Sequence, residues 1–453
     1  MQLKFTPQLD PDFVPAILWK QNYLNEILTS NDKEPVVITL TRPDNTVSRW
    51  ESYISPSHPK TGFYLERTLK FLLWMKGGTE IAISNKQYAT ELSQIYSATG
   101  ARAFDFDFMG KKIYDQPFNV IYKPIDQMSA SKEISSPLGR YLDGCRIGFD
   151  LGGSDRKCAA VKDGKVVFSE EIAWNPYFEK NSKYHIDGIR DSLKRAAAHL
   201  PRVDAIGGSS AGVFVNNEVR SASLFRGLDE ADFEQNIRRL FFDLQKEWGI
   251  PFDIVNDGEV TALAGSMSLN ANAVLGVSMG TSVAAGYVTP EGSITPWLNE
   301  LAFAPIDYRD NGPVDEWSGD SGCAVQYFCQ QGVARLAPKA GLEYKDMPFP
   351  EQLIEVQELM KKGDERAASI YHTIGACFGY TIAHWADFYD VSNLLILGRV
   401  TSGEGGEIII DDARKVLESE FPELGSSINL CTPNEQDKRH GQAIAAASLA
   451  SIS

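Results

Sequence analysis

The sequence predicts an α/β fold in which two related halves follow a smaller N-terminal α/β domain. An apolar run at 147–151 breaks into a glycine-rich turn at 152–154, and two further strand-like runs come after it. The run 273–279 breaks in the same way at 280–282. The two copies start at residues 147 and 273, which is too far apart for the repeats of a solenoid. The repeat therefore indicates a duplicated domain whose two turns face each other across a cleft.

The composition is that of an ordinary globular protein. The chain has 453 residues, 43% hydrophobic and 23% charged, which allows two or three domains with sizeable cores. No apolar run reaches the ~18 residues of a membrane helix, and the N-terminus lacks the apolar core of a signal peptide. A cytoplasmic location is therefore expected. The six cysteines include no Cys-x-x-Cys pair, so reduced and mostly buried thiols are expected.

The negative charge is distributed unevenly. Residues 1–140 hold 16 of the 44 basic residues and 15 of the 60 acidic residues, so this part is near neutral. The rest of the chain holds 44 − 16 = 28 basic and 60 − 15 = 45 acidic residues, so the whole net charge of −16 arises after residue 140. An acidic surface argues against nucleic acid as a partner.

The first 123 residues have the pattern of a mixed α/β domain without recognisable chemistry. Apolar runs around an Arg-Pro-Asp-Asn turn predict a hairpin, and a helix ended by two glycines follows. Phe104, Phe106 and Phe108 alternate with Asp105 and Asp107, which predicts a half-buried strand, with a metal site as the alternative. The expected elements are strands 36–40, 47–50, 81–83 and 104–108 and helices 64–75 and 88–96.

Prolines, serines and low periodicity mark residues 124–144 as a linker. We therefore expect an N-terminal domain at 1–123, this linker, and two lobes at 145–271 and 272–453. The Asp163-Gly164 pair predicts that the first lobe opens with a three-strand meander. The expected elements of the lobes are strands 147–151, 158–162, 166–172, 205–208, 252–257, 273–279, 283–288 and 394–398, a strand restarting at 294, helices 186–200, 233–248, 259–267 and 364–389, and a polar loop at 401–406.

Asp150 and the turn after it have the features of a phosphate site. The adjacent glycines, Gly152 and Gly153, let main-chain N–H groups approach an anion without a Cβ in the way. Asp150 could bind Mg²⁺ there, directly or through water. A tight hairpin without such a role is the alternative.

Four short segments match the motifs of one family. Residues 150–154 match an Asp-Leu/Ile-Gly-Gly-Thr phosphate motif, and residues 280–282 match a second, Gly-Thr-Gly. Residues 255–258 match Glu-Asn-Asp-Ala, which carries a catalytic base, and residues 397–400 match a Leu-Gly-Gly-Gly loop near an adenosine. In this order they resemble the ROK family of bacterial sugar kinases and repressors. The resemblance implies duplicated actin-like ATPase domains, which are ribonuclease H-like, around a cleft.

The resemblance also implies roles for the matching residues. Asp257 would be the general base, with a helix N-cap as the alternative for this Asp. Asp150 would serve Mg²⁺, and Lys157 would either add charge or be a solvated surface lysine. The acceptor would be contacted by Asn256, Glu300, Ser209 and Ser210, where the two serines could equally form a plain polar turn. The nucleotide would be held by Gly152, Gly153, Ser154, Gly280, Thr281, Ser282, Gly398 and Ser402.

The sequence departs from the family at its zinc and sugar motifs. Phe303 stands where the family has a His that binds sugar and zinc, and only Cys323 remains of the four zinc ligands. We therefore expect no structural zinc. Glu316 and Ser318 are expected to hydrogen-bond and hold the same loop instead. Because Phe303 and Val325 replace two polar contacts, an ordinary hexose should bind poorly.

Two functions from different classes remain. The first is an ATP-dependent kinase, using ATP and Mg²⁺ on a hydroxyl of a sugar or sugar-like substrate. The second is a non-catalytic sugar-binding or regulatory protein. Asp150, Asp257 and both glycine turns favour the kinase, whereas residues 1–140 lack the basic helix-turn-helix pattern of a DNA-binding repressor. No nucleic-acid or membrane partner is expected, and a homodimer is a possible assembly. The histidines at helical positions are expected to be structural: His185, His199, His372, His384 and His440.

Overall fold

The computed structural model describes residues 2–133, 139–432 and 441–452, which form two compact units. Unit 1 contains Met1–Ile134, Val277–Ala285 and Trp297–Cys431. Unit 2 contains Ser135–Gly276, Gly286–Pro296 and Thr432–Ser453. Two of the boundaries between the units fall within neighbouring strands, β12 (Val274–Met279) and β13 (Val283–Val288).

The N-terminal part of unit 1 is a four-stranded sheet with helices packed on it. Its elements are α1 (Ala16–Glu26), β1 (Glu34–Thr41), β2 (Val47–Ile54), α2 (Thr61–Lys76), β3 (Glu80–Ile83), α3 (Lys86–Ile95) and β4 (Asn119–Tyr122). The strand order is β2-β1-β3-β4, with β1 antiparallel to both neighbours and β4 parallel to β3. The predicted hairpin is confirmed, and Asn45 adopts a left-handed φ of 63° in its turn.

Helix α2 is the most deeply buried element of this part. All residues from Tyr64 to Met75 are buried, and the helix ends at Gly77, which has a φ of 72°, as predicted. Three of the buried side chains are charged: Glu66, Arg67 and Lys70. Buried charges are stable only when they are paired, so their partners identify what this helix holds in place.

The strand predicted at 104–108 is wrong. Residues Ala103–Asp107 form helix α4, and a π-helical turn continues to Tyr114. Asp105 is fully buried and accepts hydrogen bonds from Lys70 Nζ (3.1 Å) and from the indole N–H of Trp74. Phe104 and Phe108, one helical turn apart, stack on each other. Phe104 also stacks on Trp74, and Phe108 packs against Trp74 at a tilt. The alternating aromatic residues therefore followed the i, i+4 spacing of a helix, and the metal alternative fails because Asp105 is paired with an ammonium group.

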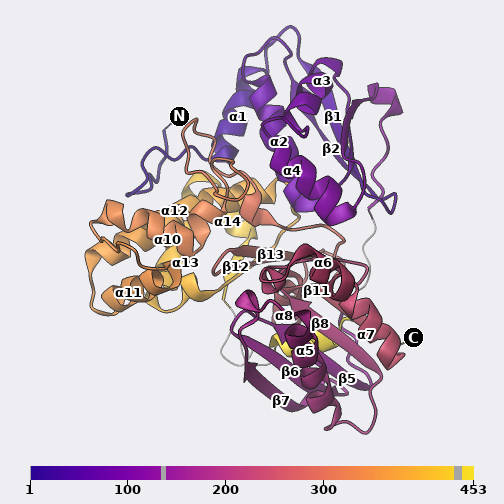
Figure 1. The fold of residues 1–453 in the computed structure, drawn as a ribbon. Coiled ribbons are helices and arrows are strands. Elements are labelled where there is room, and N and C mark those ends of the chain that lie inside the picture. Colours follow the sequence, from indigo (N-terminus) through magenta and orange to yellow (C-terminus); the bar gives the residue numbers. More distant parts are fainter. Residues whose placement is uncertain (1, 134–138, 433–440, 453) are drawn as a thin grey trace. The chain divides into compact units, whose positions relative to one another are not determined.

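Unit 2 is built on a five-stranded mixed sheet. Its strands are β5 (Cys145–Leu151), β6 (Asp155–Lys162), β7 (Lys165–Ala173), β8 (Ala205–Ser210) and β11 (Phe252–Asn256). The order is β11-β8-β5-β6-β7, with the first three parallel and the last two antiparallel (Figure 1). The predicted meander is confirmed, with Asp163 and Gly164 both at positive φ in its tight turn. The other elements are α5 (Ser182–Ala197), the ribbon β9 (Val213–Val215) and β10 (Glu218–Ser221), α7 (Leu240–Trp248), α8 (Asp257–Leu269) and α15 (Gln442–Ala447).

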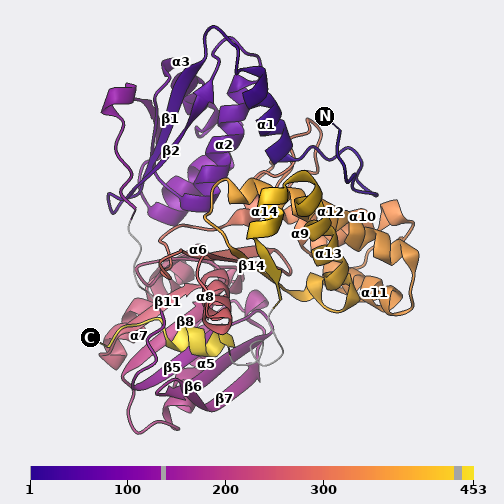
Figure 2. The ribbon, with the colours of Figure 1, turned by 180° about the vertical axis from the view of Figure 1, so that it is seen from behind.

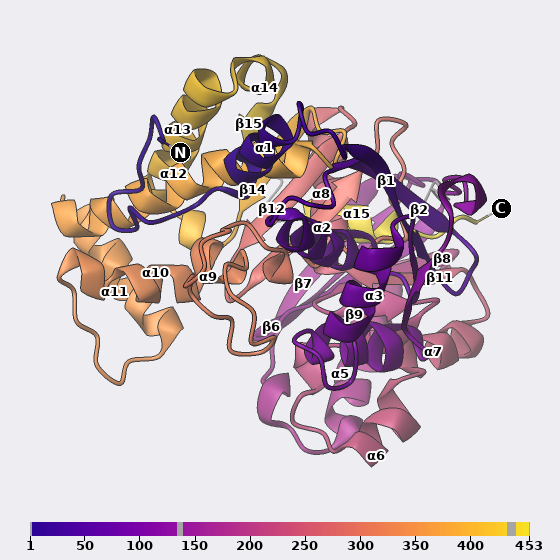
Figure 3. The same ribbon diagram turned by 90° about the horizontal axis from the view of Figure 1, so that it is seen from above.

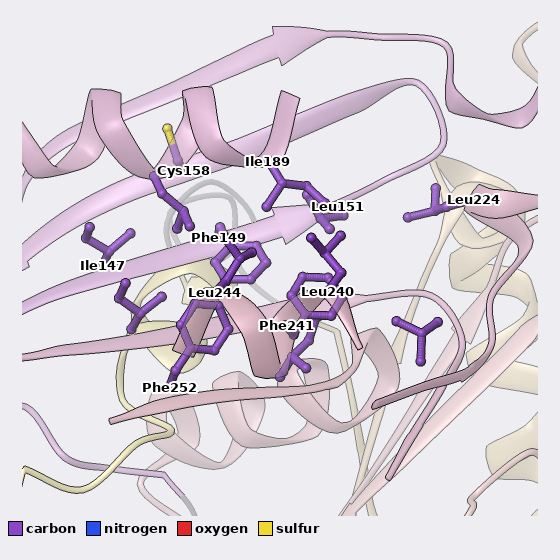
Figure 4. Close-up of a cluster of buried hydrophobic side chains, with 14 of the residues drawn as sticks. Ile147, Phe149, Leu151, Cys158, Ile189, Leu224, Leu240, Phe241, Leu244 and Phe252 are labelled. Carbon is purple, nitrogen blue, oxygen red and sulfur yellow. The ribbon is translucent and has the colours of Figure 1, made fainter. Parts of the chain in front are cut away.

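The two faces of this sheet are covered differently. Alternate residues of β5, namely Ile147, Phe149 and Leu151, point to one face and pack with side chains of α5 and α7 in a single core (Figure 4). On the other face, Gly148 and Gly207 lie against α15, the yellow C-terminal helix in Figure 2. A Cβ on Gly207 would lie 1.7 Å from a carbonyl oxygen of α15, so this helix can approach the sheet only over glycine.

The single helix predicted at 233–248 is divided. A short helix α6 (Glu230–Asp232) continues as a π-helical turn at Phe233–Ile237, and α7 begins anew at Leu240. The predicted apolar face nevertheless packs as expected, because Ile237, Leu240, Phe241 and Leu244 all belong to the core of unit 2. The hydrophobic spacing therefore predicted the buried face correctly, but it did not predict the break in the helix before Leu240.

The second half contains a second sheet with the order β13-β12-β14-β15. Strand β14 (Asn393–Leu397) pairs in parallel with β15 (Asn429–Cys431). Relative to the first sheet, the third strand of the meander is reduced to a single bridge between Val288 and Ile294. Helices follow in unit 1 (Figure 3): α9 (Val325–Phe328), α10 (Gln330–Leu336), α11 (Phe349–Lys361), α12 (Glu365–Ala386), α13 (Glu404–Glu420) and α14 (Pro422–Ser427). The predicted loop 401–406 is wrong in its second half, because α13 already starts at Glu404.

None of the helices in the described ranges is long and apolar enough to cross a membrane. His185 and His384 are fully buried, and His199 stacks on Phe168 at 3.9 Å between ring centroids. His372 pairs with Asp412, and His440 lies outside the described residues.

Candidate functional site

Asp150 lies near the end of β5 between two polar neighbours of unit 2. It stands opposite Lys157 on β6 and beside Ser209 on β8, and the Ser209 hydroxyl donates a hydrogen bond to it. Burial raises the pKa of Asp150, and the Ser209 hydrogen bond and the charge of Lys157 oppose that rise. Lys157 is half-exposed and also lies 3.4 Å from Asp155. It therefore compensates the charge at the end of β5 and is not an isolated surface lysine.

Asp257 is the first residue of α8, directly after β11. Burial, and then the negative charge of Asp150, raise its pKa to about 6. One carboxylate oxygen accepts a hydrogen bond from the Gly258 N–H at 3.0 Å. The structure thus brings two acids, Asp150 and Asp257, close enough to repel each other at one end of the sheet.

The N-cap of α8 is Asn256, which decides the alternative raised for Asp257. The Asn256 side-chain oxygen accepts from Gly258 N–H at 2.7 Å, and its amide N–H donates to the Gly212 carbonyl at 2.7 Å. Asn256 thereby fixes both the helix and the loop before the β9–β10 ribbon. Asn256 therefore occupies the N-cap position, and the Asp257 carboxylate shares the Gly258 N–H with it.

The turn 152–155 is a tight hairpin with two spare N–H groups. Gly152 N–H donates to the Asp155 carbonyl at 2.9 Å, so this glycine closes the turn. Trp174 holds the turn from outside: its indole donates to the Gly152 carbonyl at 2.7 Å and its backbone N–H to the Ser154 carbonyl at 3.1 Å. Within the described chain the N–H groups of Gly153 and Ser154 have no acceptor. The hairpin and phosphate interpretations are therefore compatible.

The second glycine turn lies in unit 1 and is closed in a similar way. Gly280 N–H donates to the Ser282 carbonyl at 2.9 Å, and the Gly280 carbonyl accepts from Gln330 N–H at 3.0 Å. Gly398, with a φ of 110°, packs so closely that a Cβ would lie 2.4 Å from the Met279 carbonyl. The ends of β12 and β14 are therefore adjacent. Ser402 donates to the Gly398 carbonyl at 3.4 Å.

The remaining predicted residues fall in different surroundings. Ser210 is fully buried on β8, and its hydroxyl has no hydrogen-bond partner among the residues that the structure describes. Glu300 is half-buried, and its backbone N–H donates to the Trp74 carbonyl at 3.0 Å. The predicted residues thus form two groups. Unit 2 contains Asp150, Gly152, Gly153, Ser154, Ser209, Ser210, Asn256 and Asp257, and unit 1 contains Gly280, Thr281, Ser282, Glu300, Gly398 and Ser402.

The loop before Cys323 is held by carboxylates, but not by the predicted one. Ser318 donates from its hydroxyl (2.6 Å) and its N–H (2.7 Å) to Asp315, so the expected bond with Glu316 is wrong, and Glu316 is exposed. Asp320 is buried and anchors the loop to the N-terminal part of unit 1. Its cationic partners are Arg67 at 2.9 Å, Lys70 at 3.0 Å and Arg102 at 2.6 Å.

Phe303 is part of an aromatic cluster in unit 1. Its ring lies 4.4 Å from that of Trp74 and 6.3 Å from that of Trp317, measured between centroids. Cys323 is fully buried, and its thiol lies 3.8 Å from Asp320. In the part of the chain that the structure describes, no group of three His, Cys, Asp or Glu residues could hold a metal ion.

Comparison with protein families shows which family the chain belongs to. The profile of the ROK family matches residues 146–438, which is more than half of the chain. The chain belongs to the ROK family. The match covers the sheet of unit 2, the sheet β13-β12-β14-β15 and the two acids of unit 2, as the sequence motifs predicted, but not the N-terminal sheet.

Relatives within the ROK family include kinases and a regulator. N-acetylmannosamine kinase from Pasteurella multocida (strain Pm70) is 24% identical over 268 residues, which cover 57% of this chain and 82% of that protein. A ROK family glucokinase from Streptomyces griseus, crystallised with glucose and AMPPNP, is 19% identical with a TM-score of 0.50 over 68% of this chain and 99% of that one. A ROK family transcriptional regulator, a homolog of the E. coli MLC protein, is 18% identical with a TM-score of 0.54 over 68% and 79%. These structures confirm the predicted α/β fold with duplicated actin-like ATPase domains.

Three residues beside the site were missed from the sequence. Trp174 holds the 152–155 turn, and Tyr177 and Arg226 lie next to it. Trp174 to Tyr177 directly follow a predicted strand, so a Trp-Asn-Pro-Tyr segment leaving the sheet was an available signal. Arg226 is distant in sequence and gave none.

Proposed function

We propose that this ROK protein is an ATP-dependent kinase that phosphorylates a hydroxyl of a sugar or sugar-like substrate, with Asp257 as the general base. The observation that carries the proposal is the state of Asp257. It follows the end of strand β11, next to the N-cap residue Asn256, with a pKa raised to about 6. A base whose pKa lies close to neutrality can both accept a proton and be deprotonated at rest.

The proposed step is a direct phosphoryl transfer. The acceptor hydroxyl loses its proton to the Asp257 carboxylate while its oxygen forms a bond to the γ-phosphorus of ATP. The bond between that phosphorus and the β–γ bridging oxygen breaks, and ADP leaves with the bond's electron pair. Most of the catalysis then consists of positioning and charge neutralisation.

The residues of unit 2 fit a nucleotide phosphate with Mg²⁺. Asp150 offers a carboxylate oriented by Ser209, and Gly153 and Ser154 offer two N–H donors. Mg²⁺ is commonly held by one or two carboxylates together with substrate phosphates, so a single protein acid suffices. The ion would neutralise phosphate charge and relieve the repulsion between Asp150 and Asp257.

Two relatives support the nucleotide and the sugar as ligands. The Streptomyces griseus glucokinase binds glucose and AMPPNP, and the Pasteurella multocida protein is a kinase of N-acetylmannosamine. In this chain Phe303 packs against Trp74 and Val325 is buried in α9. Two apolar side chains at these positions disfavour glucose itself and favour a substrate with fewer hydroxyls or a bulkier apolar group there.

The decisive variant is Asp257→Asn, with Asp253→Asn on the preceding strand, β11, as the matched control. We expect Asp257→Asn to lower kcat by about 10²- to 10⁴-fold while MgAMPPNP still binds, and Asp253→Asn to keep wild-type turnover. Turnover is measured with labelled ATP on a panel of sugars, amino sugars and polyols, beside a thermal-shift screen of the same compounds. Near-normal turnover of Asp257→Asn would remove the base assignment. A sugar that shifts the melting temperature without any turnover would instead support the non-catalytic alternative.

A further inference from the structure

We propose that Tyr177 and Arg226 form a second wall of the phosphate turn, where the Tyr177 hydroxyl donates a hydrogen bond to the transferred phosphoryl group and Arg226 supplies positive charge. This inference rests on the proposed kinase function. All of its residues lie in unit 2, together with Asp150 and Asp257.

The Tyr177 ring lies directly on Gly153. A Cβ built on Gly153 would be 2.1 Å from the Tyr177 hydroxyl oxygen and 2.4 Å from the ring carbon that carries it. Any side chain at Gly153 would therefore displace this hydroxyl. Glycine at position 153 therefore leaves room for the Tyr177 ring as well as for a phosphate. The phenol O–H of Tyr177 then lies beside the turn whose two N–H groups have no acceptor.

The Tyr177 hydroxyl is available for a ligand. The side chain is half-buried, and within the described residues the hydroxyl makes no hydrogen bond. A tyrosine that only covered the core would normally send its hydroxyl to solvent or to a protein acceptor. Here the hydroxyl ends against the turn that already offers main-chain donors, so an anion bound by the turn would reach it.

The segment carrying Tyr177 is fixed by its neighbours. His185 is fully buried, and its Nε2 lies 3.1 Å from both the Pro176 and the Leu224 carbonyl oxygens, so the ring bridges the segments before Tyr177 and before Arg226. Trp174, three residues before Tyr177, is bonded to the turn itself. This rigid support keeps the hydroxyl in place before any ligand arrives, as electrostatic catalysis requires.

Arg226 adds a positive charge that forms no ion pair with a carboxylate in the described part of the chain. Its guanidinium lies 4.3 Å from the Tyr177 ring centroid and 5.3 Å from that of Phe178. Arg226 is exposed, and no carboxylate in the described part of the chain pairs with it. A guanidinium stacked on rings keeps its N–H edges free for an oxyanion. Together with Lys157, it would offset the two acids that otherwise repel phosphate.

The test compares Tyr177→Phe and Arg226→Gln with Tyr184→Phe. Phenylalanine keeps the ring on Gly153 and removes only the hydroxyl, so the fold is preserved. Tyr184 is a control in the same region, because its hydroxyl only accepts a hydrogen bond from the Asn175 N–H at 2.9 Å. We expect Tyr177→Phe to lower kcat about 10- to 100-fold with the KM for the sugar within about twofold, and Arg226→Gln to raise the KM for MgATP about tenfold.

Binding measurements separate this inference from the kinase proposal. Titration calorimetry with MgAMPPNP and with Mg-pyrophosphate should show weaker binding for Arg226→Gln and Tyr177→Phe than for wild type and Tyr184→Phe. If wild type turns over no sugar on the panel but these differences in affinity persist, the kinase proposal fails. The inference that Tyr177 and Arg226 bind the phosphates is then still supported. If Tyr177→Phe keeps both wild-type kcat and wild-type affinity, Tyr177 merely covers the core and the inference is overturned.

Discussion

At the scale of single residues, the raised pKa of Asp257 results from two opposing influences. As the first residue of α8, Asp257 sits where the helix dipole favours a negative charge and would lower its pKa. Burial and the charge of Asp150 outweigh that effect and raise the pKa to about 6. The dipole acts over one turn at a helix end, whereas removal of water weakens the charged form directly. The same balance has consequences for activity and for stability.

The first consequence is a pH dependence of catalysis. Because Asp257 must be deprotonated to act as a base, kcat/KM should rise with pH and level off above about pH 6. Asp150→Asn removes the neighbouring negative charge, so in its residual activity the same limb should move to lower pH. Steady-state kinetics between pH 4.5 and 8 as an experimental range, with Asp253→Asn alongside, measure both limbs. A limb that stays in place in Asp150→Asn would show that the two acids are not coupled.

The second consequence is that the proposed base destabilises the folded protein at neutral pH. The folded pKa of Asp257 is raised, so its stabilising contribution is complete below the ordinary value of 3.8 and is lost as the pH rises through about 6. Asp257→Asn cannot ionise and should increase the free energy of unfolding at pH 7 by on the order of 1 kcal/mol. The gain should shrink at pH 4, where wild-type Asp257 is protonated. Melting curves at both pH values test this, and a loss of stability at pH 7 would contradict it.

At the scale of elements, helix α2 and the loop 315–323 form one electrostatic unit. Glu66, Asp105 and Asp320 face Arg67, Lys70 and Arg102, and none of these six side chains is more than 15% exposed. Although burial raises the pKa of Asp320, the charges of Arg67 and Lys70 lower it further, so it stays ionised. We infer that the ammonium and guanidinium groups of the N-terminal segment hold this loop, which in other family members is expected to bind zinc.

Removal of one partner from this cluster should be costly. Asp320→Asn leaves Arg67 and Lys70 buried with one fewer counter-charge, so we expect the free energy of unfolding to fall by about 3–5 kcal/mol. Asp310→Asn is the matched control, because Asp310 is exposed and should change stability by less than about 0.5 kcal/mol. Urea denaturation of the three proteins measures the difference. Equal midpoints for Asp320→Asn and wild type would mean that the charges do not hold the loop.

The same elements show what the sequence could and could not predict. Periodic patterns predicted the meander of β5–β7 and the strands that carry Asp150 and Asp257, because local hydrophobic spacing determines them. The segment 104–108 was mispredicted because its helix depends on a buried ion pair with Lys70, 35 residues away. Asp320 was missed for a similar reason. Its partners Arg67 and Lys70 lie about 250 residues earlier in the chain, and no local pattern announces such a pair.

At the scale of the whole molecule, the two sheets repeat one strand order, and the N-terminal segment is built into one of the two units. The order β11-β8-β5-β6 in the first sheet corresponds to β15-β14-β12-β13 in the second. Met1–Ile134 shares a compact unit with Trp297–Cys431. The division of the chain into a domain at 1–123, a linker at 124–144 and two lobes stays a prediction. An independent domain at 1–123 and a first segment that is part of unit 1 predict different results when that segment is removed.

The N-terminal arm, here residues 2–14, makes contacts with the second half of the chain that bear on this question. Asp10 is 1% exposed and is bound by Arg309 at 2.9 Å, Arg335 at 2.7 Å and Lys339 at 3.1 Å. Its backbone neighbours also pair with the second half, since Leu9 N–H donates to Thr373 and Val14 N–H to Asp307. If the arm were absent, Arg335 and Lys339 would lose this counter-charge, and Arg309 would keep Asp307, which lies 2.8 Å from its Nε.

A chain shortened to residues 139–453 should therefore fail to fold cooperatively, although the ROK family match starts only at residue 146. Without the first segment, Asp320 loses Arg67, Lys70 and Arg102 together, and Arg309 and Arg335 lose Asp10. Loss of these ion pairs, together with exposure of apolar side chains such as Phe303 that pack on the removed segment, should offset much of the roughly 5–15 kcal/mol that holds a typical domain folded. Circular dichroism melting of the shortened chain measures this, with full-length Asp10→Asn as a milder variant that should melt below wild type. A shortened chain that melts cooperatively and binds MgAMPPNP would show that residues 1–123 are an independent domain and that the ion pairs across unit 1 are dispensable.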